Sequence, residues 1–176
     1  GVYREADVYD AMETGFNRHD ADIGLADYDH NPKAYVKKLN ELESKLVTQT
    51  SRTEERSDMQ QFSTPPALAG LASWVANINS SDVAMEPTAG TGNIVARIID
   101  AHPQRVYANE LSDHRAALLA SIEDVTEAFS EDADHLYAIF HGKGIRPSVI
   151  VMNPPFSRNI RHKGKRKIGV GLKHVL

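Results

Sequence analysis

Short apolar runs alternate with helix-like segments from residue 61 onward, and this alternation limits the fold more than any other feature of the chain. The runs that predict strands are Val83–Met85, Arg105–Asn109, Val125–Phe129 and Ser148–Met152. Helices are predicted between them, over residues 93–101, 112–122 and 133–140. Strands that alternate with helices are typical of parallel sheets joined by right-handed crossovers. The sequence therefore predicts an α/β fold whose doubly wound sheet has about four parallel strands.

Residues 1–60 predict an N-terminal helical segment, and residues 61–176 are expected to form the main domain. One helix is predicted from Glu5 to about Phe16. A second begins at Asn31-Pro32, because Asn is a preferred N-cap and Pro suits the first helical position. Apolar residues recur at helical spacing on its buried face: Tyr35, Leu39, Leu42 and Leu46. We expect this segment to cover the main domain.

A third helix is predicted to begin at Thr64-Pro65, with Thr64 as its N-cap. An apolar stripe follows at helical spacing and consists of Leu68, Leu71, Val75 and Ile78. We expect this stripe and the neighbouring Trp74 to pack into the core rather than to contact a ligand.

Composition excludes several classes of protein. The 176 residues contain no Cys, which rules out disulfides and Cys-ligated metal centres. The eight His residues show no metal-ligand spacing, and no apolar run is long enough to span a membrane. The first residues also lack the pattern of a signal peptide. We expect a cytoplasmic protein that uses no metal.

A Gly-rich turn, Glu86-Pro87-Thr88-Ala89-Gly90-Thr91-Gly92, follows the first predicted strand. Glycines at such a turn let the backbone approach a ligand closely. No Gly-Lys-Ser/Thr follows, so this is not a phosphate-binding loop of that type. Glu86 adds a negative charge, which would repel a pyrophosphate and suits a cationic ligand.

The acid Glu110 follows the second predicted strand and lies 18 residues after Gly92. An acid about 20 residues beyond a Gly-rich turn, at a strand end, is placed to bind ribose hydroxyls. NAD and S-adenosylmethionine both carry such a ribose, so this feature alone does not separate them.

The tetrapeptide Asn153-Pro154-Pro155-Phe156 follows the last predicted strand and is the most specific signal in the chain. Two prolines hold the backbone rigidly and contribute no N–H donors. The Asn153 side-chain oxygen and the Pro154 carbonyl can then accept both hydrogens of one amino group. This localises the nitrogen lone pair, which can attack a methyl sulfonium. Phe156 offers a face on which a planar base can stack.

These motifs together resemble those of the N6-adenine DNA methyltransferases. Within that family, the chain most resembles the methylase segments of phage and plasmid methylase–helicase proteins of the strawberry-notch type. Residues 61–66 look like the N-terminal cofactor motif, residues 86–92 like motif I, Glu110 like the motif II acid, and residues 153–156 like motif IV. The resemblance implies a Rossmann-like methyltransferase sheet in a bacterial, phage or plasmid context.

The resemblance also implies roles for individual residues. Phe62 and Thr64 would lie near the methionine part of S-adenosylmethionine, and Glu86 near its amino group. Asp132 would lie near the adenine ring, with Asp134 as a competing candidate. The remaining expected cofactor contacts are Thr88, Gly90, Gly92 and Glu110. The expected catalytic residues are Asn153, Pro154, Pro155 and Phe156. An adenine inside duplex DNA would have to flip out to reach them.

Basic residues are concentrated after the tetrapeptide. From Phe156 onward there are seven, with no acidic residue, although the whole chain carries a net charge of −4. This stretch is either a polyanion contact or a solvated tail. Five of its residues are our candidates for contacting DNA: Arg158, Arg161, Lys163, Lys165 and Arg166.

The chain departs from the family pattern in its extent, because it stops about 20 residues after Phe156. Later strands and a target-recognition domain are therefore expected from further polypeptide or from a second chain. Two other functions stay open. The same tetrapeptide chemistry serves amino groups in RNA and glutamine amides. Alternatively, a non-catalytic antirestriction or DNA-associated protein could retain this fold to bind a partner.

Overall fold

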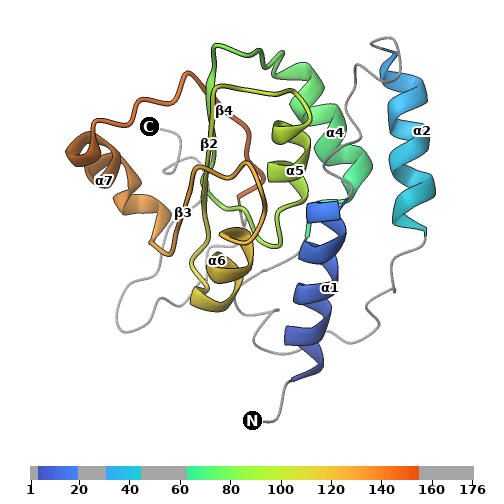
Figure 1. Cartoon of the computed structure of the whole chain (residues 1–176), viewed down its shortest axis with the longest axis horizontal. Helices are drawn as coiled ribbons and strands as arrows, with labels where there is room; N and C mark the ends of the chain where they lie inside the picture. Colours follow the sequence, from blue (N-terminus) through green and yellow to red (C-terminus); the bar gives the residue numbers. More distant parts are fainter. Residues whose placement is uncertain (1–3, 20–30, 45–62, 155–176) are drawn as a thin grey trace.

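The computed structural model describes residues 4–19, 31–44 and 63–154 of the chain. Within them, four strands form one sheet in the order β3-β2-β1-β4 (Figure 1). All neighbouring strands run parallel. The strands are β1 (Val83–Glu86), β2 (Arg105–Asn109), β3 (Glu127–Phe129) and β4 (Val149–Ile150). The predicted α/β fold with a parallel, Rossmann-like sheet is confirmed.

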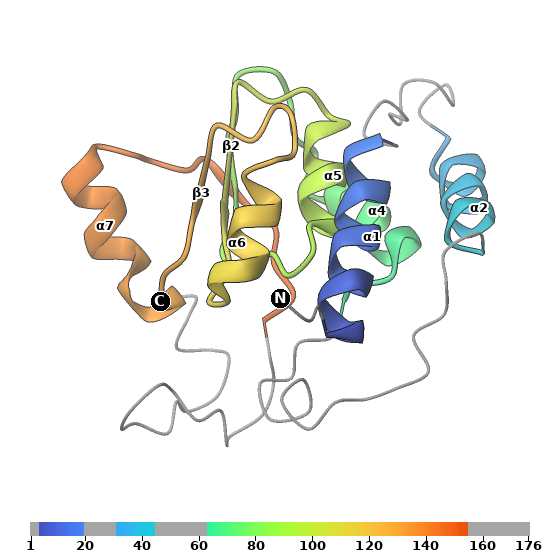
Figure 2. The ribbon, with the colours of Figure 1, turned by 60° about the horizontal axis from the view of Figure 1, so that its bottom comes forward.

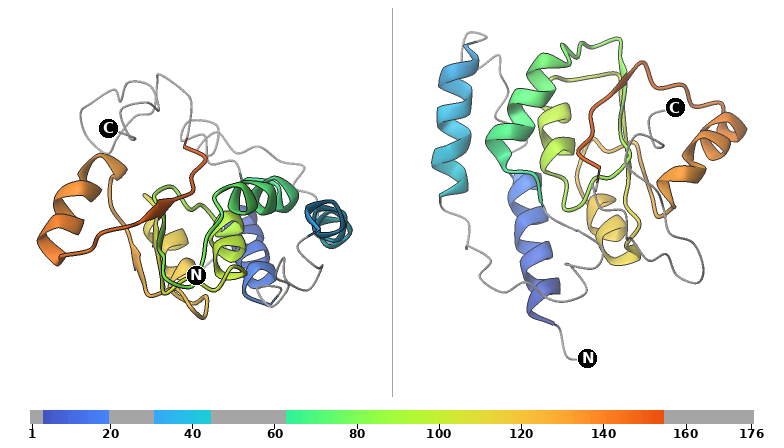
Figure 3. Two further views of the ribbon diagram at one scale, coloured as in Figure 1. Left: turned by 90° about the horizontal axis from the view of Figure 1, so that it is seen from above. Right: turned by 180° about the vertical axis from the view of Figure 1, so that it is seen from behind.

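Helices cover both faces of this sheet. They are α1 (Glu5–His19), α2 (Pro32–Glu43), α4 (Pro66–Val75), α5 (Asn93–Ile99), α6 (Asp113–Leu119) and α7 (Leu136–Lys143), with a short 3-10 helix η2 (Ala133–His135) before α7. Seen from above, α7 lies on one side of the sheet, whereas α5, α4 and α1 lie on the other (Figure 3). The element order and the two covered faces make the sheet doubly wound, as predicted.

The strands build two separate cores because successive side chains point to opposite faces of the sheet. On β1, Ala84 joins the cluster formed with α5 and α6, whereas Met85 joins the cluster under α7. On β2, Val106 and Ala108 face the first cluster and Tyr107 faces the second. Small residues dominate the strands on the α5 side, so these helices approach the sheet closely.

The helix α4 begins one residue later than predicted. Its first residue is Pro66, and Pro65 occupies the N-cap position with an extended backbone, φ −52° and ψ 135°. A residue that precedes proline is biased away from helical conformation, so the second proline sets the start of the helix. Thr64 is therefore not the N-cap, and its side chain is left for another contact.

The predicted burial of the apolar stripe is wrong within α4, although Ile78, which follows the helix, packs against the core. Leu68, Leu71, Trp74 and Val75 are between 41% and 69% exposed. The helix instead buries its small residues, which are Ala67, Ala69, Gly70 and Ser73. The reason is that α4 packs between α2 and α5, and two helices can approach closely only where side chains are small.

Several other elements differ from prediction only in extent. The helix α6 begins after Ser112 as expected but ends at Leu119, and the Ser112 side chain makes no capping hydrogen bond. The predicted helix over residues 133–140 starts as η2 and continues as α7 to Lys143, where Gly144 ends it with φ +69°. The third and fourth strands are shorter than their apolar runs, and Leu46 lies outside the described residues.

The N-terminal helix α1 packs beside α5 and α6 (Figure 2). A buried ion pair fastens it there, because Arg115 of α6 donates Nε to Asp10 Oδ2 at 2.9 Å and Nη2 to Asp10 Oδ1 at 3.1 Å. Such a bidentate pair fixes both the position and the rotation of the helix. None of the described helices combines the length and apolar character needed to cross a membrane.

The same substitution at two helical glycines tests the close packing of α2 on α4. A Cβ on Gly70 would collide with Leu39 Cδ1 and come within 2.8 Å of Tyr35 Cε1, and both side chains are buried. We expect Gly70→Ala to lower the free energy of unfolding by about 1–3 kcal/mol, because the buried neighbours have little room to move.

Gly15→Ala is the matched control, since a Cβ on Gly15 in α1 meets no atom within 4 Å. This change should raise the free energy of unfolding by about 0.5–1 kcal/mol, through better helix propensity. Urea unfolding of both variants measures the two effects. Equal shifts in the same direction would contradict the packing described here.

Candidate active site

All four strands run in the same direction, so their carboxyl ends meet at one edge of the sheet. The chain moves outward from β1 to β2 and β3, and then returns to add β4 on the other side of β1. In parallel α/β sheets, ligands bind beyond the carboxyl ends of the strands at this reversal of order. The Gly-rich turn follows β1 and Asn153 follows β4, so both border the reversal.

Glu86 ends β1 and is fully buried, with no exposed surface. Its Oε1 accepts hydrogen bonds from the Thr88 N–H at 3.4 Å and the Thr88 hydroxyl at 3.3 Å. Its Oε2 has no hydrogen-bond partner among the residues that the structure describes. A buried carboxylate oxygen without a partner is costly, and a cationic group placed there would offset that cost.

The environment of Glu86 changes its ionisation. Burial raises the pKa of the carboxyl to about 8, and the negative charge of Glu110 adds to the rise. Hydrogen bonds from Thr88, and to a smaller extent the nearby backbone N–H of Asn153, act in the opposite direction and lower this pKa. Asn153 and the Gly-rich turn therefore act on the same buried acid.

Glu110 follows β2 and is held against the Gly-rich turn. Its Oε2 accepts the Gly90 N–H at 2.9 Å, and its Oε1 accepts the Ser112 N–H at 3.0 Å. Each carboxylate oxygen can accept more than one hydrogen bond. The two backbone contacts fix the orientation of Glu110 and leave capacity for two further donors, such as a pair of hydroxyl groups.

The two glycines of the turn meet different requirements. Gly90 has φ +57°, and a Cβ there would meet no atom within 4 Å, so this part of the turn borders open space that a ligand can enter. Gly92 has φ +97°, and a Cβ there would lie 2.9 Å from Ile122 Cδ1. The positive φ favours glycine at both positions. At Gly92 it is packing against the α6 region that excludes a side chain.

Asn153 contacts the segment that precedes α4. Its Nδ2 donates to the Thr64 hydroxyl at 3.1 Å, and the Thr64 carbonyl accepts a hydrogen bond from Asn93 Nδ2 at 2.7 Å. Thr64 therefore links Asn153 to Asn93, the first residue of α5. The bond to Thr64 uses the amide nitrogen of Asn153 and leaves its oxygen to accept from a ligand.

Asp132 has a local role in the structure, because it caps η2 by accepting the Asp134 N–H at 3.1 Å. Its predicted contact with a cofactor adenine stays a prediction, as does the competition with Asp134. Other predicted site residues lie outside the described part of the chain: Phe62, Pro155, Phe156, Arg158, Arg161, Lys163, Lys165 and Arg166.

Sequence reasoning missed the contribution of α1 to this site. Glu13 is buried and accepts three hydrogen bonds, from the Thr91 hydroxyl at 2.7 Å, the Ser63 hydroxyl at 2.6 Å and Asn93 Nδ2 at 3.1 Å. Thr14 and Asn17 donate from the same helix to the Thr91 carbonyl. The N-terminal helix thus holds the Gly-rich turn from behind.

A signal for this role was present in the sequence. Asp10, Glu13, Thr14 and Asn17 recur at helical spacing, and all four are buried. A polar stripe at the spacing normally occupied by apolar residues indicates a helix that packs against polar groups. Reading it would have indicated that the first helix packs against polar groups of the main domain, although not which ones.

Asn109, the last residue of β2, connects the loops that follow β1 and β3. Its Nδ2 donates to the Pro87 carbonyl and the Glu131 carbonyl, both at 3.0 Å, and its Oδ1 accepts the Glu131 N–H at 3.1 Å. Because this buried amide hydrogen-bonds through both its nitrogen and its oxygen, it stabilises the relative positions of the Gly-rich turn and the loop before η2. No cluster of three metal-ligating side chains occurs among the described residues.

Comparison with known proteins adds no assignment: no protein-family model, no curated protein and no solved structure matches the chain. The described structure defines a Rossmann-like α/β protein with two acids, a Gly-rich turn and an Asn-Pro pair at the carboxyl edge of its sheet.

The raised pKa of Glu86 predicts a dependence of stability on pH. The folded protein binds the proton of Glu86 more tightly than the unfolded chain, whose value is near 4.5. Its contribution to stability is therefore full below the unfolded pKa and is lost as pH rises through about 8. Glu86→Gln mimics the protonated acid and should remove this dependence.

Thermal unfolding of both proteins between about pH 5.5 and pH 8.5 measures the effect. The Tm of the wild type should fall relative to that of Glu86→Gln as pH rises. Glu41→Gln, which alters an exposed acid of α2, is the matched control and should follow the wild type. Parallel curves for wild type and Glu86→Gln would show that Glu86 is already ionised.

Proposed function

We propose that the chain is the cofactor-binding and catalytic part of an S-adenosylmethionine-dependent methyltransferase that modifies the N6 amino group of adenine in DNA. The observation that carries this proposal is the convergence of Glu86, Glu110 and Asn153 at the reversal of strand order. Glu86 and Asn153 come from adjacent strands, and the backbone N–H of Asn153 acts on the Glu86 carboxyl.

The residues at this edge fit S-adenosylmethionine by their chemistry. The partnerless Oε2 of Glu86 suits the ammonium group of the methionine part. Glu110, held by two backbone N–H groups, suits the two ribose hydroxyls. Gly90, whose N–H contacts Glu110, borders open space that leaves room for a ligand. When bound, the cofactor supplies a methyl group on a positively charged sulfur, which a nitrogen lone pair can attack.

Asn153 and Pro154 supply the chemistry at the amino group that is methylated. The Asn153 Oδ1 and the Pro154 carbonyl accept the two hydrogens of this amino group, which localises its lone pair. Thr64 orients Asn153 by accepting from its Nδ2. The nitrogen loses a proton only after it has gained the methyl group and become strongly acidic, so no general base is needed before transfer.

The choice of adenine in DNA over other amino groups rests on the resemblance of the motifs and on the basic residues after residue 156. The same chemistry at Asn153 could methylate an amino group in RNA or a glutamine amide. A cofactor-binding protein without transferase activity is the alternative from another class. The two experiments below separate these functions.

Binding of S-adenosylmethionine should release a proton near pH 7. Glu86 is largely protonated there, because its pKa is raised to about 8, and an ammonium group beside it favours the ionised form. Calorimetric titrations in buffers of different ionisation enthalpy should therefore show release of close to one proton.

Glu86→Gln should release none and bind about tenfold more weakly, because a neutral amide replaces a charge-assisted hydrogen bond. Glu41→Gln serves again as the control and should behave as the wild type. Absence of binding by S-adenosylmethionine and by its demethylated product would contradict the proposal.

Asn153→Ala should strongly reduce methyl transfer and keep cofactor binding. Incubation with methyl-labelled S-adenosylmethionine and separate pools of DNA, RNA and protein measures transfer, and digestion of the DNA should yield labelled N6-methyladenine. We expect a loss of about a hundredfold or more, the usual effect of removing one preorganised polar contact from a transition state. Asn40→Ala, at an exposed position of α2, is the matched control.

Each other outcome has a defined meaning. Label that enters RNA or protein instead of DNA would replace the proposed substrate while retaining the chemistry. Cofactor binding without transfer to any pool, also when further polypeptide of the parent protein is supplied, would favour the non-catalytic binding protein. Equal activity of Asn153→Ala and wild type would exclude the proposed catalytic role.

A further inference from the structure

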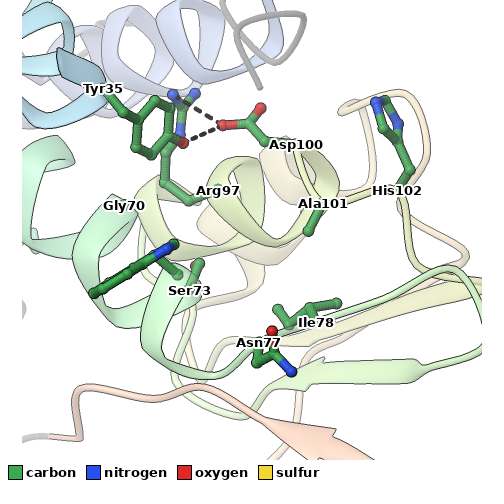
Figure 4. A pocket seen from close by; sticks show the side chains of 10 residues that line it. Tyr35, Gly70, Ser73, Asn77, Ile78, Arg97, Asp100, Ala101 and His102 are labelled. Carbon is green, nitrogen blue, oxygen red and sulfur yellow. Dashed lines mark hydrogen bonds and ion pairs between the residues drawn. The ribbon is translucent and has the colours of Figure 1, made fainter. Parts of the chain in front are cut away.

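A cavity lies at the edge of the sheet opposite the candidate active site, and its volume is about 250 Å³ (Figure 4). Asn77 and Ile78 border it just before β1 begins, and Ala101 and His102 border it just before β2 begins. Glu86, Glu110 and Asn153 all follow the other ends of the strands. The cavity is therefore separate from the proposed methyltransferase site.

The floor of the cavity carries a buried ion pair. Arg97 Nη1 lies 3.2 Å from Asp100 Oδ2, and the Tyr35 hydroxyl donates to the same oxygen at 2.6 Å (Figure 4). All three side chains are almost fully buried. Because the positive charge of Arg97 is opposed by Asp100, the floor favours a ligand without net charge.

Ser73 lines the same cavity and is 5% exposed. Its hydroxyl is buried and has no hydrogen-bond partner among the described residues. A buried hydroxyl that makes no hydrogen bond destabilises the folded state. A ligand with a donor or acceptor at this position would remove that cost, so Ser73 indicates where a polar edge of the ligand would lie.

Trp74 gives the cavity a flat apolar surface on which a ligand can stack. It is 42% exposed and lines the cavity, instead of lying in the core as its sequence context predicts. Asn77 and His102 border the cavity with φ of +51° each, and their side chains can both donate and accept hydrogen bonds. Polar edges and a stackable face together match a planar heterocycle.

We propose that this cavity binds a neutral nucleobase, stacked on Trp74 and hydrogen-bonded to Ser73. The volume of about 250 Å³ limits the ligand to a small one such as a single base, because pockets for larger ligands usually measure about 300–1,000 Å³. The base can belong to a free nucleoside or to a single-stranded oligonucleotide. This inference does not rest on the proposed methyltransferase function.

The sequence contains a single Trp, so one indole N–H signal in the nitrogen-15 NMR spectrum reports directly on the cavity. The probes are adenosine, guanosine, cytidine and thymidine, titrated separately, and a short single-stranded DNA of mixed sequence. We expect at least one nucleoside to shift this signal in a saturable way. A shift with the oligonucleotide and with no nucleoside would assign the site to a base presented by a polynucleotide.

Ser73→Ala should weaken this binding about fivefold, because it removes one hydrogen bond from the complex. The same change should raise the Tm of the ligand-free protein, because it removes a buried hydroxyl that has no partner. A merely structural Ser73 would not show these opposite effects. Ser121→Ala, which alters an exposed hydroxyl beyond α6, is the matched control and should leave nucleoside binding unchanged.

Asn153→Ala should also leave the indole shift unchanged, since Asn153 lies at the other edge of the sheet. This variant separates the two proposals, because it affects methyl transfer alone. The inference is overturned if no nucleoside or oligonucleotide shifts the indole signal in a saturable way. It is equally overturned if Ser73→Ala binds every probe as tightly as the wild type.

Discussion

The turn between β1 and α5 is held by two carboxylates on opposite sides, and the candidate active site depends on both. Glu110 accepts the Gly90 N–H from the side of β2, whereas Glu13 accepts the Thr91 hydroxyl from the side of α1. A Gly-rich turn has many accessible conformations, and ordering it costs entropy. The two acids select one conformation and thereby set where a ligand can approach Gly90.

Buried polar groups without partners mark both proposed binding sites. Glu86 Oε2 lies at the carboxyl edge of the sheet and the Ser73 hydroxyl at the opposite edge, and each lacks a hydrogen bond among the described residues. Among the neighbouring buried polar groups, Glu13 and Asn109 have well-formed hydrogen bonds, whereas Asn93 Oδ1 also lacks one among the described residues. The unmet groups at Glu86 and Ser73 are consistent with ligand binding there, because a bound ligand or an ordered water would offset their cost.

Most of the fold could be predicted because it follows from local pattern. Apolar runs separated by helical segments indicated β1 to β4 and their parallel arrangement, and Asn31-Pro32 indicated the start of α2, where the Asn31 side chain caps the helix. The positions of Glu86, Glu110 and Asn153 at strand ends followed from the same pattern. What failed was the burial of α4, whose Leu68 and Trp74 are exposed, since helical spacing does not tell which face meets a neighbour.

The sequence by itself determined the order of strands and helices, the acids and glycines at the strand ends, and the chemistry available to Asn153 and Pro154. Only the tertiary structure decided that α1 supports the Gly-rich turn, that α4 turns its small face inward, and that Trp74 and Ser73 border a cavity at the opposite edge of the sheet. The physical reason is that these features depend on contacts between segments far apart in the chain. Glu13 and Thr91 are 78 residues apart, and no local pattern specifies such a pairing.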